Sequence, residues 1–260
     1  MISSLNFKDR SLLFARLAGI AYLDKVTATV EVNKLGFDSI EFYDRDGAQA
    51  FRFENAEDII IACRGTEPTQ LNDVKADLRA VPVMAETVGR VHLGFKAEVD
   101  DLWPMVSPKL ALGNTKYNKK LWFCGHSLGA AMATIMAARC NVDHKMLDIE
   151  EIYTYGSPRV GWSKYVQSLD VVHHRWVNNN DIVTRVPLSI MGYRHHGTEH
   201  YMNSYGNIRP LTSWQRTKDR LRGMWVGIKK RDIDNFSDHL ITNYITNLET
   251  YANNMEFLQR

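Results

Sequence analysis

Four short, largely apolar runs constrain the fold of this chain more than any other feature of its sequence. They cover residues 59–63, 121–124, 149–155 and 171–177, and each ends abruptly in a turn of glycine or polar residues. Such runs are typical of strands that are buried on both faces. Segments with helical spacing separate them. Buried strands that alternate with helices predict an α/β fold with a mostly parallel central sheet and helices on both faces.

Two further patterns complete the expected outline. Leu13, Leu17 and Ile20 recur at i, i+4 and i+7, which predicts an amphipathic helix that runs to about residue 23. Residues 39–54 alternate apolar and polar side chains on both sides of a turn at residues 45–47, the pattern of a hairpin. No internal repeat or linker interrupts the 260 residues, so we predict one domain over residues 1–260.

The composition argues against two classes of protein. The chain has 32 Lys and Arg against 30 Asp and Glu, a net charge of +2, which provides no general attraction for nucleic acid. Its longest nearly apolar stretch, residues 128–138, has eleven residues, whereas a membrane-spanning helix needs about 18. We therefore expect neither nucleic-acid binding nor a transmembrane segment.

The N-terminal residues and the cysteines bear on location. Charged residues interrupt the first 19 residues, so the continuous apolar core of a secretory signal is missing. We expect a cytoplasmic protein, or one exported by a route that the sequence does not show. Cys63, Cys124 and Cys140 are odd in number and lack a metal-ligand spacing. Cys63 and Cys124 could lie on neighbouring strands, but we favour buried free thiols over a disulfide.

A Gly-His-Ser-Leu-Gly motif at residues 125–129 carries the first chemical signal. It matches G-x-S-x-G and lies between the run 121–124 and a helix of small residues. In that context the serine occupies a sharp, strained strand-to-helix turn, and glycines at its second neighbours avoid collisions. The alternative is a glycine-bounded turn with an inert serine. The flanking strand and helix favour Ser127 as a nucleophile.

A serine hydroxyl needs a base, usually a histidine oriented by a carboxylate, and in α/β folds of this type the chain order is Ser, acid, His. Asp181 suits the acid, because it follows the strand expected at 171–177 in a polar turn. A surface turn aspartate is the alternative. Two sets of histidines suit the base: the cluster at residues 195–200, and His239, which precedes a predicted helix. The residues alone favour His239 only slightly.

An oxyanion hole requires two donors. The backbone N–H of Leu128, directly after the serine, is one candidate. The turn at residues 64–66 provides the other, because Gly65 permits close backbone approach and Thr66 has both an N–H and a hydroxyl. A plain turn that ends the strand is the alternative.

Together these segments resemble the class 3 lipases, the fungal-type triacylglycerol lipases, from about residue 10 to 250. The matching motifs are IIIACRGT, VHLGF, CGHSLGAA, TYGSPRVG, NNNDIVTRVP, GYRHHGTE and SDHLITNY. The resemblance implies an α/β-hydrolase fold, a triad of Ser127, Asp181 and His239, and an oxyanion hole of Thr66 and Leu128. It also selects His239, not His195, as the base, and implies no metal or cofactor.

The expected function is that of a serine carboxylic ester hydrolase, first of all a triacylglycerol lipase, which acts on an ester or lipid through an acyl-enzyme. A phospholipase A1 or a short-chain carboxylesterase could use the same triad, and a non-catalytic lipid-binding protein is a remote alternative. The segment that matches the family's lid, residues 67–76, is short and polar, with Leu71 and Val74 as its only large apolar residues. This departure weakens the expectation of strong interfacial activation and leaves shorter or more soluble esters open.

A basic segment at residues 214–231 combines seven Lys and Arg residues with tryptophans at helical spacing. This composition fits a helix that rests on anionic lipid. It also fits a solvated amphipathic helix packed on the body of the protein, and we favour this second interpretation.

Overall fold

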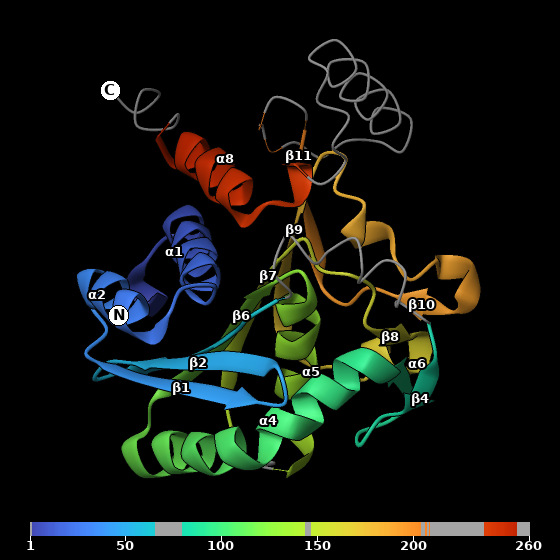
Figure 1. The fold of residues 1–260 in the computed structure, drawn as a ribbon, viewed down its shortest axis with the longest axis horizontal. Helices are drawn as coiled ribbons and strands as arrows, with labels where there is room; N and C mark the ends of the chain where they lie inside the picture. The colour runs from blue at the N-terminus through green and yellow to red at the C-terminus, as the bar shows by residue number, and fades with distance from the viewer. Residues whose placement is uncertain are drawn as a thin grey trace.

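A mostly parallel sheet forms the centre of the molecule (Figure 1). The computed structural model describes residues 2–65, 80–143, 147–203, 206, 208 and 237–253. Within them, seven strands lie in the order β1 (Ser39–Arg45), β2 (Ala48–Glu54), β3 (Asp58–Cys63), β6 (Lys120–His126), β7 (Ile149–Tyr155), β9 (Val172–Asn178) and β11 (Thr198–Met202). From β3 to β11 all neighbours are parallel. The predicted sheet is confirmed.

The expected hairpin forms the antiparallel edge of this sheet. β1 pairs with β2 from Ser39 opposite Glu54 to Arg45 opposite Ala48. Asp46 and Gly47 form the turn with positive φ angles of 52° and 93°. These angles suit the tight turns whose twist matches that of the strands, and Asp-Gly is a preferred sequence for them. The hairpin prediction is therefore confirmed, except that Arg45, expected in the turn, ends β1.

Helices cover both faces of the sheet, as predicted (Figure 1). α1 (Phe7–Ile20), α2 (Lys25–Lys34) and α8 (Ile241–Asn253) lie on one face, and α4 (Leu93–Ala111) and α5 (Leu128–Asp143) on the other. Strand β3 shows why its sequence is continuously apolar. Ile60 and Ala62 pack in the layer of α1, whereas Ile59 and Ile61 pack in the layer of α4 and α5.

Helix α1 begins earlier than its apolar spacing predicts. The side chain of Asn6 caps it by accepting the backbone N–H groups of Lys8 and Asp9. The helix ends at Ile20, three residues before the expected end. Asp24 then caps α2 in the same way, so the chain turns sharply after residue 20. Capping side chains thus mark the start of α1 and the start of α2.

A second sheet was not predicted. It has the order β10 (Tyr193–Arg194), β8 (Gly161–Trp162), β5 (Arg90–His92) and β4 (Pro82–Met84), and it lies at the right-hand end of the molecule in Figure 1. Strands of two or three residues are too short to show a period of two. The short helices are η1 (Ile2–Ser4), η3 (Leu112–Lys116), α6 (Ser163–Gln167), η4 (Val183–Arg185), η5 (Ser189–Met191) and η6 (Ser237–His239).

The structure agrees with the predictions made for the cysteines and for membrane-spanning helices. Cys63, Cys124 and Cys140 are buried free thiols, which confirms the favoured interpretation. Among the helices of the described residues, none is long and apolar enough to cross a membrane. The basic segment at 214–231 lies outside the described residues, so its two interpretations both stand.

Candidate active site

Ser127 stands alone between a strand and a helix at the carboxyl edge of the central sheet. β6 ends at His126 and α5 begins at Leu128. The φ angle of Ser127 is +59°, a left-handed backbone conformation that residues other than glycine rarely adopt. Strain of this kind is characteristic of a serine presented on a strand-to-helix elbow. The predicted local geometry is therefore present.

The two motif glycines are required by backbone contacts. A Cβ atom on Gly125 would collide with the carbonyl group of Gly129, and one on Gly129 would collide with the carbonyl group of Cys63 in β3. The expected collisions thus occur with the start of α5 and with the neighbouring strand, not with Ser127 itself. Both glycines let the helix lie directly against the sheet.

Three predicted side chains meet at this elbow. The Oγ atom of Ser127 lies 2.8 Å from Nε2 of His239, and Nδ1 of His239 lies 2.8 Å from Oδ2 of Asp181. Ser127 is 3% exposed, and His239 and Asp181 are fully buried. Because a carboxylate only accepts, Nδ1 carries the proton and donates it, which leaves Nε2 to accept from the serine hydroxyl. This arrangement orients Nε2 of the imidazole toward the serine hydroxyl.

Asp181 is held by two further donors. The backbone N–H of Val183 donates to Oδ1 at 2.9 Å, and the hydroxyl of Tyr244 donates to Oδ2 at 2.6 Å. The Tyr244 oxygen in turn accepts the backbone N–H of Asn178. Burial and the Asp181 carboxylate raise the pKa of Tyr244 well above its usual value, so it remains a donor. Tyr244 was not predicted to belong to the site.

Gly156, at the end of β7, allows the acid and the imidazole to approach each other. Its φ angle is +61°, and a Cβ atom would lie 2.7 Å from Oδ2 of Asp181 and 2.9 Å from Nδ1 of His239. Any side chain at this position would occupy the space of the contact between them. The glycine of the Gly-Ser-Pro turn after β7 is thus part of the site.

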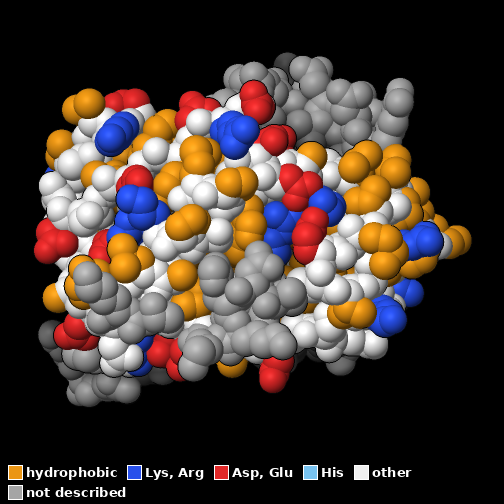
Figure 2. Space-filling model, turned by 90° about the horizontal axis from the view of Figure 1, so that it is seen from below, with side chains coloured by type: hydrophobic (Ala, Val, Ile, Leu, Met, Phe, Trp, Pro, Cys, Tyr) orange, Lys and Arg blue, Asp and Glu red, His pale blue; other side chains and the backbone are white. Residues whose placement is uncertain are grey.

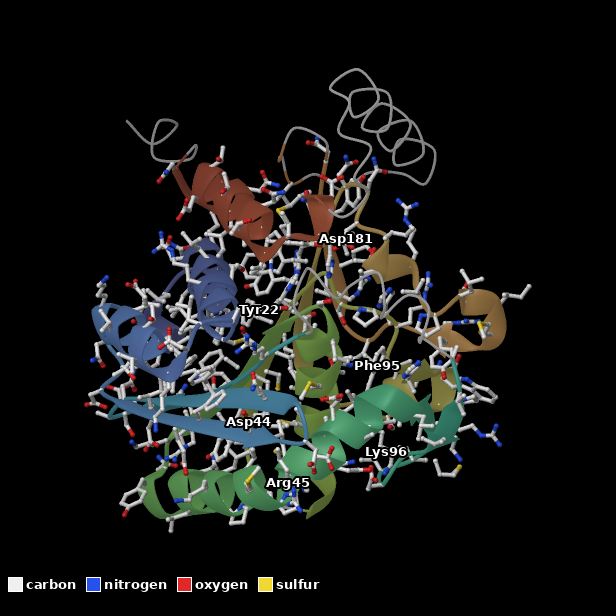
Figure 3. The ribbon with its side chains drawn as sticks, in the orientation of Figure 1. Tyr22, Asp44, Arg45, Phe95, Lys96 and Asp181 are labelled. Carbon is white, nitrogen blue, oxygen red and sulfur yellow. The ribbon has the colours of Figure 1, made fainter. Side chains whose placement is uncertain are left out.

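A second histidine supports the first from behind. The Nε2 atom of His126 lies 2.6 Å from the carbonyl oxygen of His239, and its Nδ1 atom lies 2.8 Å from the hydroxyl of Tyr22. Burial, with the neighbouring His239 as a second cause, holds the pKa of His126 well below its usual value. Figure 3 shows Tyr22 between α1 and the central strands, and Asp181 beyond their carboxyl ends. Neither Tyr22 nor His126 was predicted to belong to the site, because 104 positions separate the two residues.

The competing histidines lie elsewhere. His195 faces the carbonyl oxygen of Thr184 at 2.8 Å, and burial together with the nearby Arg175 lowers its pKa to about 3. His196 and His200 pair with two histidines of β9, at 3.1 and 3.0 Å between ring nitrogens. Of the candidates for the base, the structure therefore brings only His239 to Ser127.

The chain that leads to Thr66 passes directly beside the serine. A Cβ atom on Gly65 would lie 3.2 Å from Cβ of Ser127 and 2.6 Å from the carbonyl oxygen of His126. On the other side, Leu128 begins α5. Thr66 and the predicted lid at 67–76 lie outside the described residues. In the part of the chain that the structure describes, no group of three or more His, Cys, Asp or Glu residues could hold a metal ion.

A comparison with protein families shows to which family the chain belongs. The model of a family described as lipase (class 3) matches residues 60–191, half of the chain, with Ser127 and Asp181 inside the match. The chain belongs to the class 3 lipase family. The match ends before His239. The assignment of His239 to the candidate site of this class 3 lipase therefore rests on its contacts with Ser127 and Asp181.

Several relatives agree with this membership. The chain is 31% identical over 182 residues to a lipase of Rhizomucor miehei, a match that covers 66% of the chain and 50% of the relative. It is 34% identical over 140 residues to a lipase of Rhizopus niveus, covering 50% and 35%. It is also 30% identical over 192 residues to toxin TseL of Vibrio cholerae, covering 57% and 29%. The chain therefore spans half or less of the length of these relatives.

The solved structure of the Rhizomucor miehei triacylglyceride lipase has the same fold. It superposes with a TM-score of 0.68 at 23% identity, covering 75% of this chain and 79% of the other. A second structure, of lipase II from Rhizopus niveus, superposes with a TM-score of 0.66 at 21% identity and covers 75% and 80%. The class 3 lipase described here thus has an α/β-hydrolase fold, as the sequence predicts.

Proposed function

We propose that this chain hydrolyses carboxylic esters, with Ser127 as nucleophile, His239 as base and Asp181 as the acid that orients the base. The observation that carries the proposal is the continuous hydrogen-bonded series from Ser127 through His239 to Asp181, with both contacts at 2.8 Å, on a serine in a strained elbow. Membership of the class 3 lipase family supports the same activity.

In the proposed reaction, His239 removes the proton of the Ser127 hydroxyl as its oxygen attacks the ester carbonyl carbon. General-base catalysis of this kind contributes about 10²–10⁴ in rate. The N–H of Leu128 donates to the developing oxyanion, and we propose Thr66 as the second donor. His239 then protonates the leaving alcohol, and an acyl-enzyme remains. Water, deprotonated by His239, attacks this ester and releases the acid, while Ser127 recovers its proton.

Acylglycerols are the substrates that we propose first. The relatives include a triacylglyceride lipase of Rhizomucor miehei and a secreted mono- and diacylglycerol lipase of Fusarium solani, which is 32% identical over 117 residues. The short polar segment at 67–76 favours a second candidate, a carboxylesterase for shorter esters. A phospholipase A1 would use the same residues.

A panel of substrates separates these activities. p-Nitrophenyl esters of increasing chain length, a triglyceride emulsion and a phospholipid would be offered to the purified protein and to Ser127→Ala. The Ser127→Ala variant should lose hydrolysis of every substrate that the wild type cleaves while keeping its melting temperature. Undiminished hydrolysis by this variant would exclude the proposed mechanism.

The base is tested with a matched pair of histidine variants. His239→Ala should abolish hydrolysis, whereas His195→Ala should retain it, because His195 faces Thr184 and not the serine. The opposite result would reject His239 as the base.

A further inference from the structure

An apolar projection stands at the end of the molecule that holds the second sheet. Its residues are Leu188, Ile190 and Met191 of the η5 turn, and Met84 of β4, at the far edge of the second sheet from β10, is exposed at the same end. Ile190 is 91% exposed and Met84 is 65% exposed. Single exposed apolar residues are common, but a group of several on one end indicates an interaction surface.

The turn that carries these residues is firmly built. The N–H of Met191 donates to the carbonyl of Leu188 at 3.0 Å, and Arg194 donates to the carbonyl of Ser189 at 2.6 Å. Gly192 ends the turn with a φ angle of +91° and packs so closely on the ring of Trp162 that a Cβ atom would lie 3.1 Å from it. The apolar side chains are therefore held outward by an ordered backbone.

Two arginines lie at this end of the molecule. Arg90 of β5 lies over the ring of Trp162 at 4.8 Å and is the register partner of Met84, so Met84, Arg90, Trp162 and Gly192 form a continuous series toward η5. Arg194 lies beside the turn. Residues 157–169 and 182–197, which contribute to this end, contain no Asp or Glu.

The space-filling view agrees with this charge distribution. Figure 2 shows hydrophobic side chains interspersed with Lys and Arg at the right-hand end, where Figure 1 places β4 and β10, and no Asp or Glu is visible at that tip. Glu86 of the β4–β5 connection is ion-paired with Lys96 and Arg139. The local charge is therefore positive.

We propose that this end of the chain, the η5 surface of Met84, Arg90, Leu188, Ile190, Met191 and Arg194, docks onto an anionic lipid surface. Apolar side chains enter the boundary of the headgroups, while the arginines contact the anionic groups. The net positive charge of this end, with Glu86 already paired to two cations, selects an anionic lipid surface over a neutral one. This inference rests on the proposed function for its choice of a lipid partner.

The connection to the active site gives the docking a consequence. The segment that carries η5 starts directly after Asp181, whose carboxylate also accepts from the N–H of Val183 at the start of that segment. Arg159, in the turn after β7, donates to the carbonyl of Pro187 at 2.8 Å and joins the same segment to the Gly156 side of the site. Docking through η5 therefore attaches the lipid to the segment that continues into Asp181.

Vesicle binding tests this surface without any turnover. The full chain would be sedimented with vesicles of ether-linked phosphatidylcholine, with and without ether-linked phosphatidylglycerol, which contain no ester bonds for the protein to cleave. Ile190→Ser should weaken binding to anionic vesicles about tenfold. Arg90→Gln should weaken it about fivefold and leave binding to neutral vesicles unchanged.

Helix α2 at the opposite end provides matched controls. Val26 is 77% exposed and Lys25 is exposed beside it, so Val26→Ser and Lys25→Gln make the same chemical changes away from η5. Both should bind vesicles like the wild type. All four variants should hydrolyse a soluble short-chain ester at the wild-type rate, because none touches the site.

The outcomes are separable. Equal binding of Ile190→Ser and wild type, or equal losses in Ile190→Ser and Val26→Ser, would overturn the proposal. Equal wild-type binding to neutral and anionic vesicles would overturn its electrostatic part. Self-association of the wild type that Ile190→Ser abolishes, with vesicle binding unchanged, would make η5 a contact between copies instead. Specific vesicle binding without ester hydrolysis would reject the proposed function and retain the docking surface.

Discussion

The imidazole of His126 donates from Nε2 to the carbonyl oxygen of His239 across 2.6 Å. The direction follows from chemistry, because a carbonyl oxygen only accepts. Nδ1 of the neutral ring must then accept, and the hydroxyl of Tyr22 donates to it at 2.8 Å. His126, directly before Ser127, therefore ties the main chain of His239 to the elbow and, through Tyr22, to the turn after α1.

Replacing His126 should disturb the position of His239. His126→Leu removes the donor and leaves a buried carbonyl without it, so we expect kcat/KM for a soluble ester to fall about a hundredfold, the effect of displacing a reacting group by about 1 Å. His126→Gln keeps an N–H that reaches the same carbonyl and should retain most of the activity. Equal losses in the two variants would contradict a role for this hydrogen bond.

Gly156 and Gly47 form a matched pair. Both have positive φ angles, but a Cβ atom on Gly47 meets nothing within 4 Å, whereas one on Gly156 meets Asp181 and His239. Gly47→Ala should cost about 1 kcal/mol of unfolding free energy by backbone strain, with activity unchanged. Gly156→Ala should in addition reduce kcat by at least about a hundredfold. Denaturant unfolding and steady-state kinetics on both variants measure the two effects, and an active Gly156→Ala would contradict the crowding argument.

Tyr244→Phe removes one donor from the Asp181 carboxylate. We expect a loss of about 1–2 kcal/mol in unfolding free energy, because Asn178 also loses the acceptor of its N–H, together with a several-fold fall in kcat. Tyr155→Phe is the control, since its buried hydroxyl donates to the carbonyl of Ser11, away from the triad. It should lose similar stability and keep kcat. A Tyr244→Phe variant with wild-type kcat would show that the hydroxyl only stabilises the fold.

Paired histidines between β9 and β11 should make the protein sensitive to acid. Nδ1 of His174 lies 3.0 Å from Nε2 of His200, and burial lowers the pKa of each to about 4, with Arg10 also acting on His174. Unfolded histidine has a pKa of about 6.5, so between about pH 6.5 and 4 the unfolded state binds more protons. The unfolding free energy is therefore complete above about pH 6.5 and falls as the pH drops through this window.

The pH dependence of denaturant unfolding checks this sign. His200→Gln should make the decrease in unfolding free energy shallower between about pH 6.5 and 4, because fewer protons are taken up on unfolding. His173 and His195, whose pKa values are also lowered by burial, should maintain part of the slope. An unchanged slope in His200→Gln would contradict the assignment.

Local signals predicted the elbow and the acid. The glycines at 125 and 129 and the apolar run before them lie within a few residues of Ser127, and Asp181 follows its strand directly. The base was harder to predict, because 112 residues separate His239 from Ser127 and a histidine cluster competed with it. The resemblance to class 3 lipases selected His239, and the structure brings it to the serine.

The sequence by itself determined the layers of the fold, the elbow at Ser127 and the family, because each depends on residues close together in the chain or on their order. Only the tertiary structure decided how Tyr22, His126 and Tyr244 support the triad and how η5 projects its apolar side chains. Tyr22 lies in the turn between α1 and α2, and Tyr244 belongs to α8, whose periodicity indicates burial without showing which polar group the hydroxyl meets. Such contacts form only when segments distant in the chain pack against the same edge of the sheet.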